Sequence, residues 1–597
     1  MIGFKNKNFS TNEKILFFIG FFLIVFAALI YIDKLNGPII QPDELGYWSH
    51  VANILGLSWK NSTHGWYSYG YSLLLIPVFW ISQNMYFMYK LAIIENVILL
   101  ILNYILGIKI IFELDDKIKN SVAIGISIIS SCYSAYFFQC HIAWSEMFCY
   151  SFFMLTLYMC LKFLKTKNLL DTFLFSFCIG FIYIIHNRTI AIFIASLLLF
   201  LLMLINRSIK IKHFIIFIFV FGGIFILNYF IKIELSQIMW NIPNAFTNNS
   251  FFSEAHKLNL FCSFSGLFTL LNSFLGKFWY LQISTLGFVL FGLIYILKKI
   301  YINIKERNMD NSFFFYVFLL LSVLGTLAIN SIVMSDIQLS GKNRILIEPV
   351  FYGRYSDMIT GILIICGLLY LNYNLKKENF YKYIGILLLV TVFISIFTFM
   401  NIRNYYKIYD FKEIILHICH VPGIIFLNFT KNNILKHFLL SSVISIIIAF
   451  ILFYFILLFN KHKNNFVIGI IILLFTYSVN FYVFNNSFSS FIKNEHKFIQ
   501  NRYSKLINVI NNEMNNENIN AYWLYNSSYY ITLFRSYTRR NSFFVENINN
   551  ITDKDFVIVI FDGASYKIIL NGEKCKKIFE KNNIEYIIYS NFVKDEK

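Results

Sequence analysis

The sequence predicts an all-α polytopic membrane protein with about thirteen transmembrane helices, followed by a small extracytoplasmic α/β domain. Composition is the first reason: 58% of the 597 residues are hydrophobic, 14% are charged, and the mean hydropathy is +0.62. Two further reasons are apolar runs of membrane-spanning length and clusters of basic residues between those runs. No soluble class of protein has such a composition.

The apolar runs are about 17 to 25 residues long, which matches the hydrocarbon core of a bilayer. The first run begins after basic residues but is too long for a signal peptide and lacks a small-residue cleavage site, so we interpret it as a span. The predicted spans are 15–32, 86–112, 121–139, 143–165, 170–186, 189–206, 213–231, 279–298, 312–333, 357–374, 381–400, 437–459 and 466–485.

The charged residues predict the orientation of the chain in the membrane. If the N-terminus is cytoplasmic, every second connection is cytoplasmic too, and these connections collect most of the basic clusters, as the positive-inside rule requires. We therefore expect a multi-pass protein of the cell membrane. An odd number of spans places its C-terminus on the outer side. The net charge of +19 lies in these clusters and not on one basic face, so we expect no nucleic-acid partner.

In this orientation the long connections all lie on the outer face, at about 33–85, 232–278, 334–356 and 401–436. The first outer loop contains an apolar stretch, Tyr69 to Ser82, which is short and carries Pro77. It suits an interfacial or re-entrant helix, because a full span there would invert the charge pattern of every later loop.

The predicted domains are a transmembrane domain over 1–485 and an extracytoplasmic domain over 486–597. The second combines a polar helical stretch, Phe491 to Glu517, with two strand-like runs, Phe556 to Phe561 and Ile584 to Tyr589. Asp-Gly and Asn-Gly turn signals separate the strand-like runs, which favours an α/β fold.

The most pointed motif is Pro42-Asp43-Glu44 just after the first span, with Tyr47 and His50 on the same helical face as Asp43. A carboxylate at a membrane surface, partly desolvated by apolar neighbours, can serve as a general base. The alternative is that Asp43 only caps the helix that follows Pro42.

Two more polar groups fall on the predicted outer face. Glu146 ends the sequence His141 to Glu146 at the outer end of the fourth span, where an ionisable group is costly and tends to be functional. The alternative is that Glu146 forms an interhelical hydrogen bond that only fixes helix packing. Arg188, at the next outer turn, can bind a phosphate with its planar fork or extend to lipid phosphates.

The loop before the tenth span carries Lys342, Arg354 and Tyr355. Cations are less expected on an outer face, and arginine beside aromatic residues is typical of phosphate binding.

Other chemistries find little support. His417, Cys419 and His420 lack a second pair at a metal-ligand spacing, so we interpret them as structural. The nine cysteines show no disulfide or zinc framework. The sequence contains no P-loop, no GxSxG elbow and no Rossmann glycine pattern.

Taken together, these motifs resemble the GT-C superfamily of membrane glycosyltransferases, which includes protein O-mannosyltransferases and bacterial aminoarabinose transferases. The order of the motifs along residues 15 to 485 matches as well. The resemblance is carried by Pro42-Asp43-Glu44 with Tyr47 and Ala52, His64-Gly65-Trp66 leading into Tyr69 to Pro77, Ser145-Glu146, Arg188 and Gly353-Arg354-Tyr355.

The resemblance implies an inverting transfer of a sugar from a polyprenyl-phosphate donor to an extracytoplasmic acceptor. In that case Asp43 deprotonates the acceptor hydroxyl, and Glu44 or Glu146 orients the acceptor or a divalent cation. The donor phosphate would be held by Arg188, Arg354 and Lys342, and the acceptor or sugar would contact Tyr47, His50, His64 and Tyr355. No cofactor is implied beyond that cation, whose presence is left open, and a lipid-linked donor requires no nucleotide site.

Two alternatives remain. A flippase, transporter or polymerase of lipid-linked glycans would use the same outer charges without transferring a monosaccharide, although the spans contain almost no ionisable residues apart from Glu95. A scaffold or sensor that presents the C-terminal domain would not require Asp43.

Overall fold

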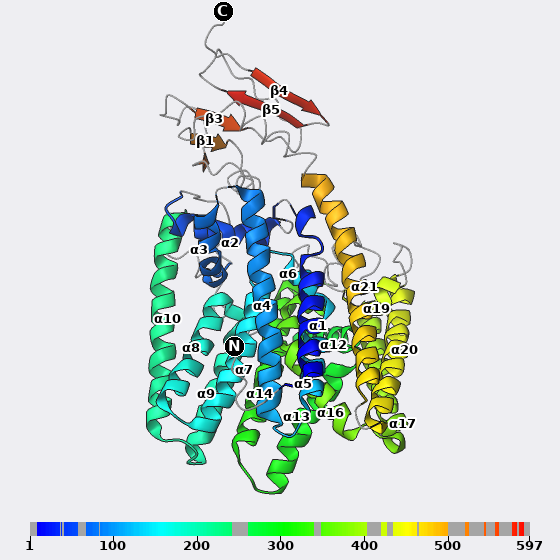
Figure 1. Ribbon diagram of the computed structural model, residues 1–597. Coiled ribbons are helices and arrows are strands. Elements are labelled where there is room, and N and C mark those ends of the chain that lie inside the picture. The colour runs from blue at the N-terminus through cyan, green and yellow to red at the C-terminus, as the bar shows by residue number, and fades with distance from the viewer. Residues whose placement is uncertain are drawn as a thin grey trace, which may run out of the picture.

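The protein is described as a computed structural model in which most of the chain forms one bundle of long helices (Figure 1). The structure describes residues 9–35, 37–38, 41–57, 67–82, 84–240, 261–339, 348–402, 420–426, 434–462, 465–499, 520–523, 542–544, 556–559, 576–581 and 584–589.

Ten helices within these residues are long and apolar enough to cross a membrane, and the number rises to twelve if each of two bent pairs is one span. The chain is therefore a multi-pass membrane protein, while the predicted count of thirteen is not confirmed. The ten are formed by α1 (Thr11–Leu29), α4 (Met85–Leu114), α7 (Glu146–Thr166), α9 (Ile190–Ile205), α10 (Ile211–Trp240), α14 (Asn311–Leu339), α16 (Thr360–Asn374), α17 (Phe380–Ile402), α20 (Ile434–Lys461) and α21 (Phe466–Ile499).

One predicted span, 279–298, is wrong as a single helix. The chain there forms α12 (Phe264–Ser284) and α13 (Phe288–Lys305), whose axes differ in direction by 109°. Leu286 and Gly287 both have positive φ angles, 55° and 85°, which end one helix and redirect the chain. The apolar run continues through this break, so hydropathy alone does not reveal it. Because α12 begins at Phe264, part of the predicted loop 232–278 is also helical.

The other bent pair is α5 (Asn120–Ser131) and α6 (Ser134–Cys140), with an angle of 59° where one span, 121–139, is predicted. Two apolar helices are shorter: α8 (Leu169–Ile185) has 17 residues, and α3 (Gly70–Ile81) has 12 and contains Pro77. At 1.5 Å per residue α3 is only about 18 Å long, too short to cross the bilayer core.

The candidate site is formed by helices and turns that meet at one end of the bundle. Successive helices run in alternate directions, so turns far apart in sequence return to the same end. They comprise α2 (Gln41–Ile54), the turn before α7, and four short helices, η2 (Asn187–Thr189), α15 (Glu348–Phe351), η4 (Gly353–Tyr355) and η5 (Asp357–Ile359).

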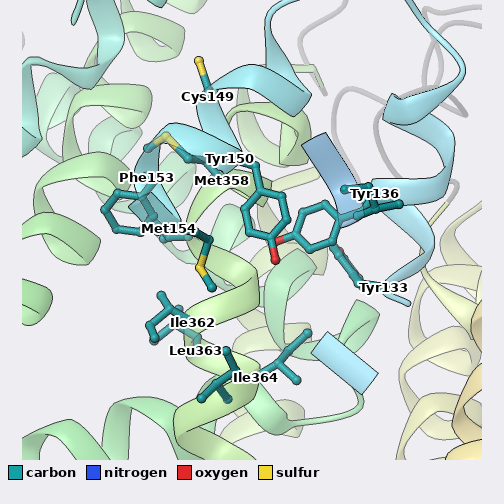
Figure 2. Close-up of a cluster of buried hydrophobic side chains, with 14 of the residues drawn as sticks. Tyr133, Tyr136, Cys149, Tyr150, Phe153, Met154, Met358, Ile362, Leu363 and Ile364 are labelled. Carbon is teal, nitrogen blue, oxygen red and sulfur yellow. The ribbon is translucent and has the colours of Figure 1, made fainter. Parts of the chain in front are cut away.

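A tightly packed core supports the turn that contains η4 and η5. Figure 2 shows Tyr136 and Tyr150 face to face, and their ring centroids are 4.0 Å apart. Met358 of η5 and Ile362 of α16 are buried in the same cluster. Interiors packed this closely resist displacement, so this cluster holds the turn in place.

The C-terminal strands form one mixed sheet beyond the end of the bundle that carries α2 and α3 (Figure 1). Its strand order is β2-β1-β3-β5-β4, with β1 parallel to β2 and β3, and β5 antiparallel to β3 and β4. Tyr522 of β1 pairs with Phe543 and Ile558, and Val559 of β3 pairs with Ile588. The strands are β1 (Asn520–Trp523), β2 (Ser542–Phe544), β3 (Phe556–Val559), β4 (Lys576–Lys581) and β5 (Ile584–Tyr589).

Strands β3 and β5 fall within the two runs predicted to be strands. The predicted helix Phe491 to Glu517 lies mostly outside the described residues, so the α/β class of this region stays a prediction. Helix α21 continues to Ile499, across the predicted domain boundary at residue 485.

Candidate active site

Arg354 lies at the centre of the candidate site and joins two carboxylates from distant parts of the chain. Its Nη1 is 2.5 Å from Oδ2 of Asp43 on α2, and its Nε is 2.5 Å from Oε1 of Glu146 on α7. The guanidinium also lies flat against Trp144, with 3.7 Å between Cζ and the ring centroid. Bonds of this kind between charged groups are short and strong, and they fix the relative positions of α2, α7 and η4.

Each acid of this cluster lies near a helix N-terminus. Glu146 is the first residue of α7, and Asp43 is the third residue of α2. The partial positive charge of a helix N-terminus stabilises a carboxylate at such a position. The side chain of Asp43 bonds to Arg354 and Tyr67, so its contacts go beyond the helix cap considered from the sequence.

Arg188 of η2 is the second cation of the cluster. Its Cζ lies 4.1 Å from the ring centroid of Tyr355, and its Nη1 is 3.5 Å from Oε1 of Glu146. The Arg188 side chain is only 5% exposed, yet its Nε and Nη1 have no hydrogen-bond partner among the described residues. Nη1 is therefore paired with Glu146 by charge and not by a hydrogen bond, and Arg188 adds a second buried cation beside Arg354.

Exposure separates the two acids. The Asp43 side chain is 24% exposed, whereas that of Glu146 is 2% exposed. Burial opposes the charge of Arg354, but the carboxylates of Glu146 and Asp43 outweigh it and hold the pKa of Arg354 well above its usual value. Arg354 is therefore a permanent cation, and Asp43 is the acid that a substrate can reach.

Hydroxyl groups and aromatic rings surround the charges. Tyr67 donates its hydroxyl to Oδ1 of Asp43 at 2.9 Å, and the hydroxyls of Tyr47 and Ser145 are 2.8 Å apart. Tyr355 lies between the two arginines, and the ring of Tyr352 packs against it at 4.4 Å. The structure thus brings together Asp43, Tyr47, Glu146, Arg188, Arg354 and Tyr355 of the residues predicted from the sequence.

Glu44 does not join this cluster. Its carboxylate is fully buried and accepts hydrogen bonds from the Tyr89 hydroxyl at 2.6 Å and the Ala143 backbone N–H at 2.8 Å. These bonds tie α2 to α4 and to the turn before α7. Glu44 therefore supports the site by holding α2 in place.

The predicted histidine and lysine contacts are placed differently. His50 is fully buried in α2, and burial together with Lys232 lowers its pKa to about 3, so its imidazole is neutral. His64 and Lys342 lie outside the described residues. Near Arg188, burial followed by the charges of Arg188, Arg354 and Lys232 holds the pKa of His186 well below its usual value.

Three residues of the site escaped the sequence analysis: Tyr67, Trp144 and Asp357. Each lies within or beside a motif that was singled out, but a polar or aromatic residue in a loop has no periodicity that reveals its partner. Asp357 is buried and accepts hydrogen bonds from Gln139 at 2.7 Å, Tyr280 at 3.1 Å and Tyr133 at 3.4 Å. It anchors the turn that carries Arg354.

The described residues offer no metal-ligand set, because no three His, Cys, Asp or Glu side chains among them converge. Arg354 stands between Asp43 and Glu146, where a divalent ion bound by both acids would have to lie. His420 is buried with its ring against Phe138, while His417 and Cys419 lie outside the described residues.

No family model and no curated protein matches the sequence, but solved structures match the fold. The crystal structure of ArnT from Cupriavidus metallidurans bound to undecaprenyl phosphate aligns with a TM-score of 0.51 and 9% identity, over 97% of this chain and 98% of that chain. The two chains share one fold. The predicted resemblance to GT-C enzymes is thus confirmed at the level of the fold.

Two further structures align less closely. The apo form of the same ArnT has a TM-score of 0.49 and 9% identity, again over 97% of this chain and 98% of that chain. The apo oligosaccharyltransferase of Archaeoglobus fulgidus has a TM-score of 0.41 and 10% identity, over 89% of this chain and 64% of that chain.

Proposed function

We propose that this protein is a membrane glycosyltransferase that transfers a sugar from a polyprenyl-phosphate donor to a hydroxyl of an extracytoplasmic acceptor. The observation that carries the proposal is the cluster in which one partly exposed acid, Asp43, lies beside the buried cations Arg354 and Arg188. An acid that can take a proton and cations that can hold a leaving phosphate are what this transfer needs. The ArnT structure with the same fold contains undecaprenyl phosphate, which supports this class of donor.

In the proposed reaction Asp43 takes the proton of the acceptor hydroxyl. The acceptor oxygen forms a bond to the anomeric carbon of the sugar, while the bond from that carbon to the phosphate oxygen breaks. The bonding electron pair leaves with the polyprenyl phosphate. Attack on the face opposite the phosphate would invert the anomeric configuration.

The cations have separate parts in this scheme. Arg188 supplies the second positive charge that would hold the phosphate, beside its ion pair with Glu146. Arg354 uses Nε and Nη1 for Glu146 and Asp43, which leaves Nη2 for the phosphate. Glu146 acts as the buried counter-ion that positions both arginines, and Tyr47 and Tyr355 line the space beside them. Lys342 and His64 stay predicted contacts.

The test is sugar transfer by the purified full-length protein from a panel of synthetic undecaprenyl-phosphate monosaccharides to the hydroxyl groups of a solubilised cell-envelope extract, followed as release of undecaprenyl phosphate. We expect Asp43→Asn to lower kcat by at least about 100-fold, the range for loss of a general base. The matched control is Asp33→Asn, because Asp33 lies at the start of the same loop, is 95% exposed and forms a surface ion pair with Lys90.

Thermal melting should show that both variants remain folded. Release of phosphate by the wild type and the Asp33 variant but not by the Asp43 variant would support the proposal. Full activity of Asp43→Asn would refute it. So would binding of every donor without turnover, which would instead favour a flippase or polymerase.

A further inference from the structure

Asp43 has a second partner besides the arginine, and this partner comes from the segment just before α3. Tyr67 donates its hydroxyl to Oδ1 of Asp43 at 2.9 Å, while Arg354 binds Oδ2 at 2.5 Å. Each carboxylate oxygen is therefore held by one donor, and the plane of the carboxylate is defined. Each oxygen still has a second lone pair that can accept a proton.

The close approach of Tyr67 to α2 depends on a glycine. A Cβ atom at Gly46 would lie 2.4 Å from Cδ2 and 2.6 Å from Cγ of the Tyr67 ring, far less than a van der Waals contact. Gly46 follows Asp43 by three residues, so it shares a face of α2 with it. The ring of Tyr47 packs edge-on against Tyr67, with centroids 5.5 Å apart, and confines it from another direction.

We propose that Tyr67 is a positioning residue for Asp43, whose hydroxyl aims the carboxylate at the acceptor, and that Gly46 makes this contact sterically possible. The inference rests on the proposed role of Asp43 as the base. An ionised carboxylate only accepts hydrogen bonds, so a phenol beside it must donate. A hydrogen bond to a charged group is short and directional, so it fixes the direction in which the Asp43 carboxylate points.

Tyr67 stays a donor through the range in which a carboxylate titrates. Burial, followed by the charge and hydrogen bond of Asp43, raises the pKa of Tyr67 far above its usual value. The other titratable groups that act on Asp43 come from three elements. They are Arg354 and Tyr355 of η4, Glu146 of α7, which shares Arg354 with it, and Tyr47 of α2.

The test is the separate measurement of kcat and KM for Tyr67→Phe in the donor assay described above. Without the Tyr67 hydroxyl the Asp43 carboxylate is aimed less well at the acceptor, so we expect kcat to fall by about 10-fold while the KM for the donor stays unchanged. Tyr69→Phe is the matched control, because the buried Tyr69 hydroxyl has no hydrogen-bond partner among the described residues.

Gly46→Ala supplies a second, steric variant. It should lower kcat in the same way by displacing the ring, and it should cause no further loss in a Tyr67→Phe background, because both changes remove one contact. If Gly46→Ala fails to fold, Tyr67→Phe alone decides.

An unchanged kcat in Tyr67→Phe, with Asp43→Asn inactive, would overturn the positioning role and leave the base assignment intact. A fully active Asp43→Asn would overturn the proposed function itself.

Discussion

Residues of the same chemical type have different parts in this site because their surroundings differ. Asp43 and Glu146 both bind Arg354, but the Asp43 side chain is 24% exposed and that of Glu146 is 2% exposed. A substrate can reach the first, while the second is enclosed by two cations. Glu44, adjacent to Asp43 in sequence, points into the protein and bonds to Tyr89. The three acids are of one chemical type in the sequence, and only their burial and their hydrogen-bond partners distinguish their roles.

At this scale we predict that Arg188→Gln weakens binding of undecaprenyl phosphate by about 10- to 100-fold, the effect of losing a hydrogen bond to a charged group. The guanidinium has donors with no described partner, and glutamine removes the charge while keeping a polar side chain. Binding to the protein in detergent micelles can be measured by native mass spectrometry.

Lys210→Gln is the control for this measurement, since Lys210 is exposed and directly precedes α10, at the opposite end of that helix from the site. Equal affinities in the Arg188 and Lys210 variants would contradict the assignment of Arg188 to the phosphate.

At the scale of elements, the turn through η4 and η5 determines where Arg354 lies. Asp357 receives hydrogen bonds from α6, α12 and the turn before α6, and its backbone oxygen accepts from Tyr136 at 2.9 Å. Tyr280 of α12 both bonds to Asp357 and packs against Gly353. Arg354 follows Gly353 directly, so a shift of this packing would move the guanidinium.

We therefore predict that Gly353→Ala impairs both stability and transfer. Its Cβ would lie 2.2 Å from Cε1 of Tyr280, so the ring or the turn must move, at a cost of about 1–3 kcal/mol in the free energy of unfolding. We expect a lower melting temperature in detergent and a loss of kcat.

Gly385→Ala on α17 is the matched control, because a Cβ atom there meets no atom within 4 Å. In a helix interior this change should be neutral or stabilising by up to about 1 kcal/mol. If the two variants behave alike, the packing of Tyr280 on Gly353 has no part in placing Arg354.

At the scale of the whole molecule, the alternation of helix directions gathers the site. Asp43, Glu146, Arg188 and Arg354 were each predicted to lie on the outer face, and the structure places all four in one cluster at one end of the bundle. Two loops separated by an even number of spans must lie on the same side of the membrane. Which side faces the cytoplasm stays a prediction that depends on the distribution of Lys and Arg.

This orientation predicts which introduced cysteines react on intact cells. In a background with Cys262, Cys419 and Cys575 changed to serine, Asp33→Cys should be labelled by a membrane-impermeant maleimide. Lys305→Cys, near the other end of the bundle, should be labelled only after permeabilisation. The cysteines on the described helices are buried, so they should contribute little background. The reverse pattern would show that the chain is inverted in the membrane.

Composition, run length and charge distribution were sufficient to predict a multi-pass membrane protein and most of its helices, because hydropathy acts locally along the chain. Motif order was sufficient to nominate Asp43, Glu146, Arg188 and Arg354. The bend between α12 and α13 was not predicted in the same way, because the window 279–298 stays apolar on average, although Gln282, Ser284, Thr285 and Gly287 lie at the bend.

Only the tertiary structure decided which of these residues meet. Arg354 pairs with Asp43 and Glu146, which come from distant parts of the chain. Tyr67 reaches Asp43 from another segment, and Glu44 bonds to Tyr89 although its neighbour Asp43 bonds to Arg354. Such contacts depend on how closely elements pack and which way each side chain points. Helix packing determines both, and the periodicity of a single sequence does not record them.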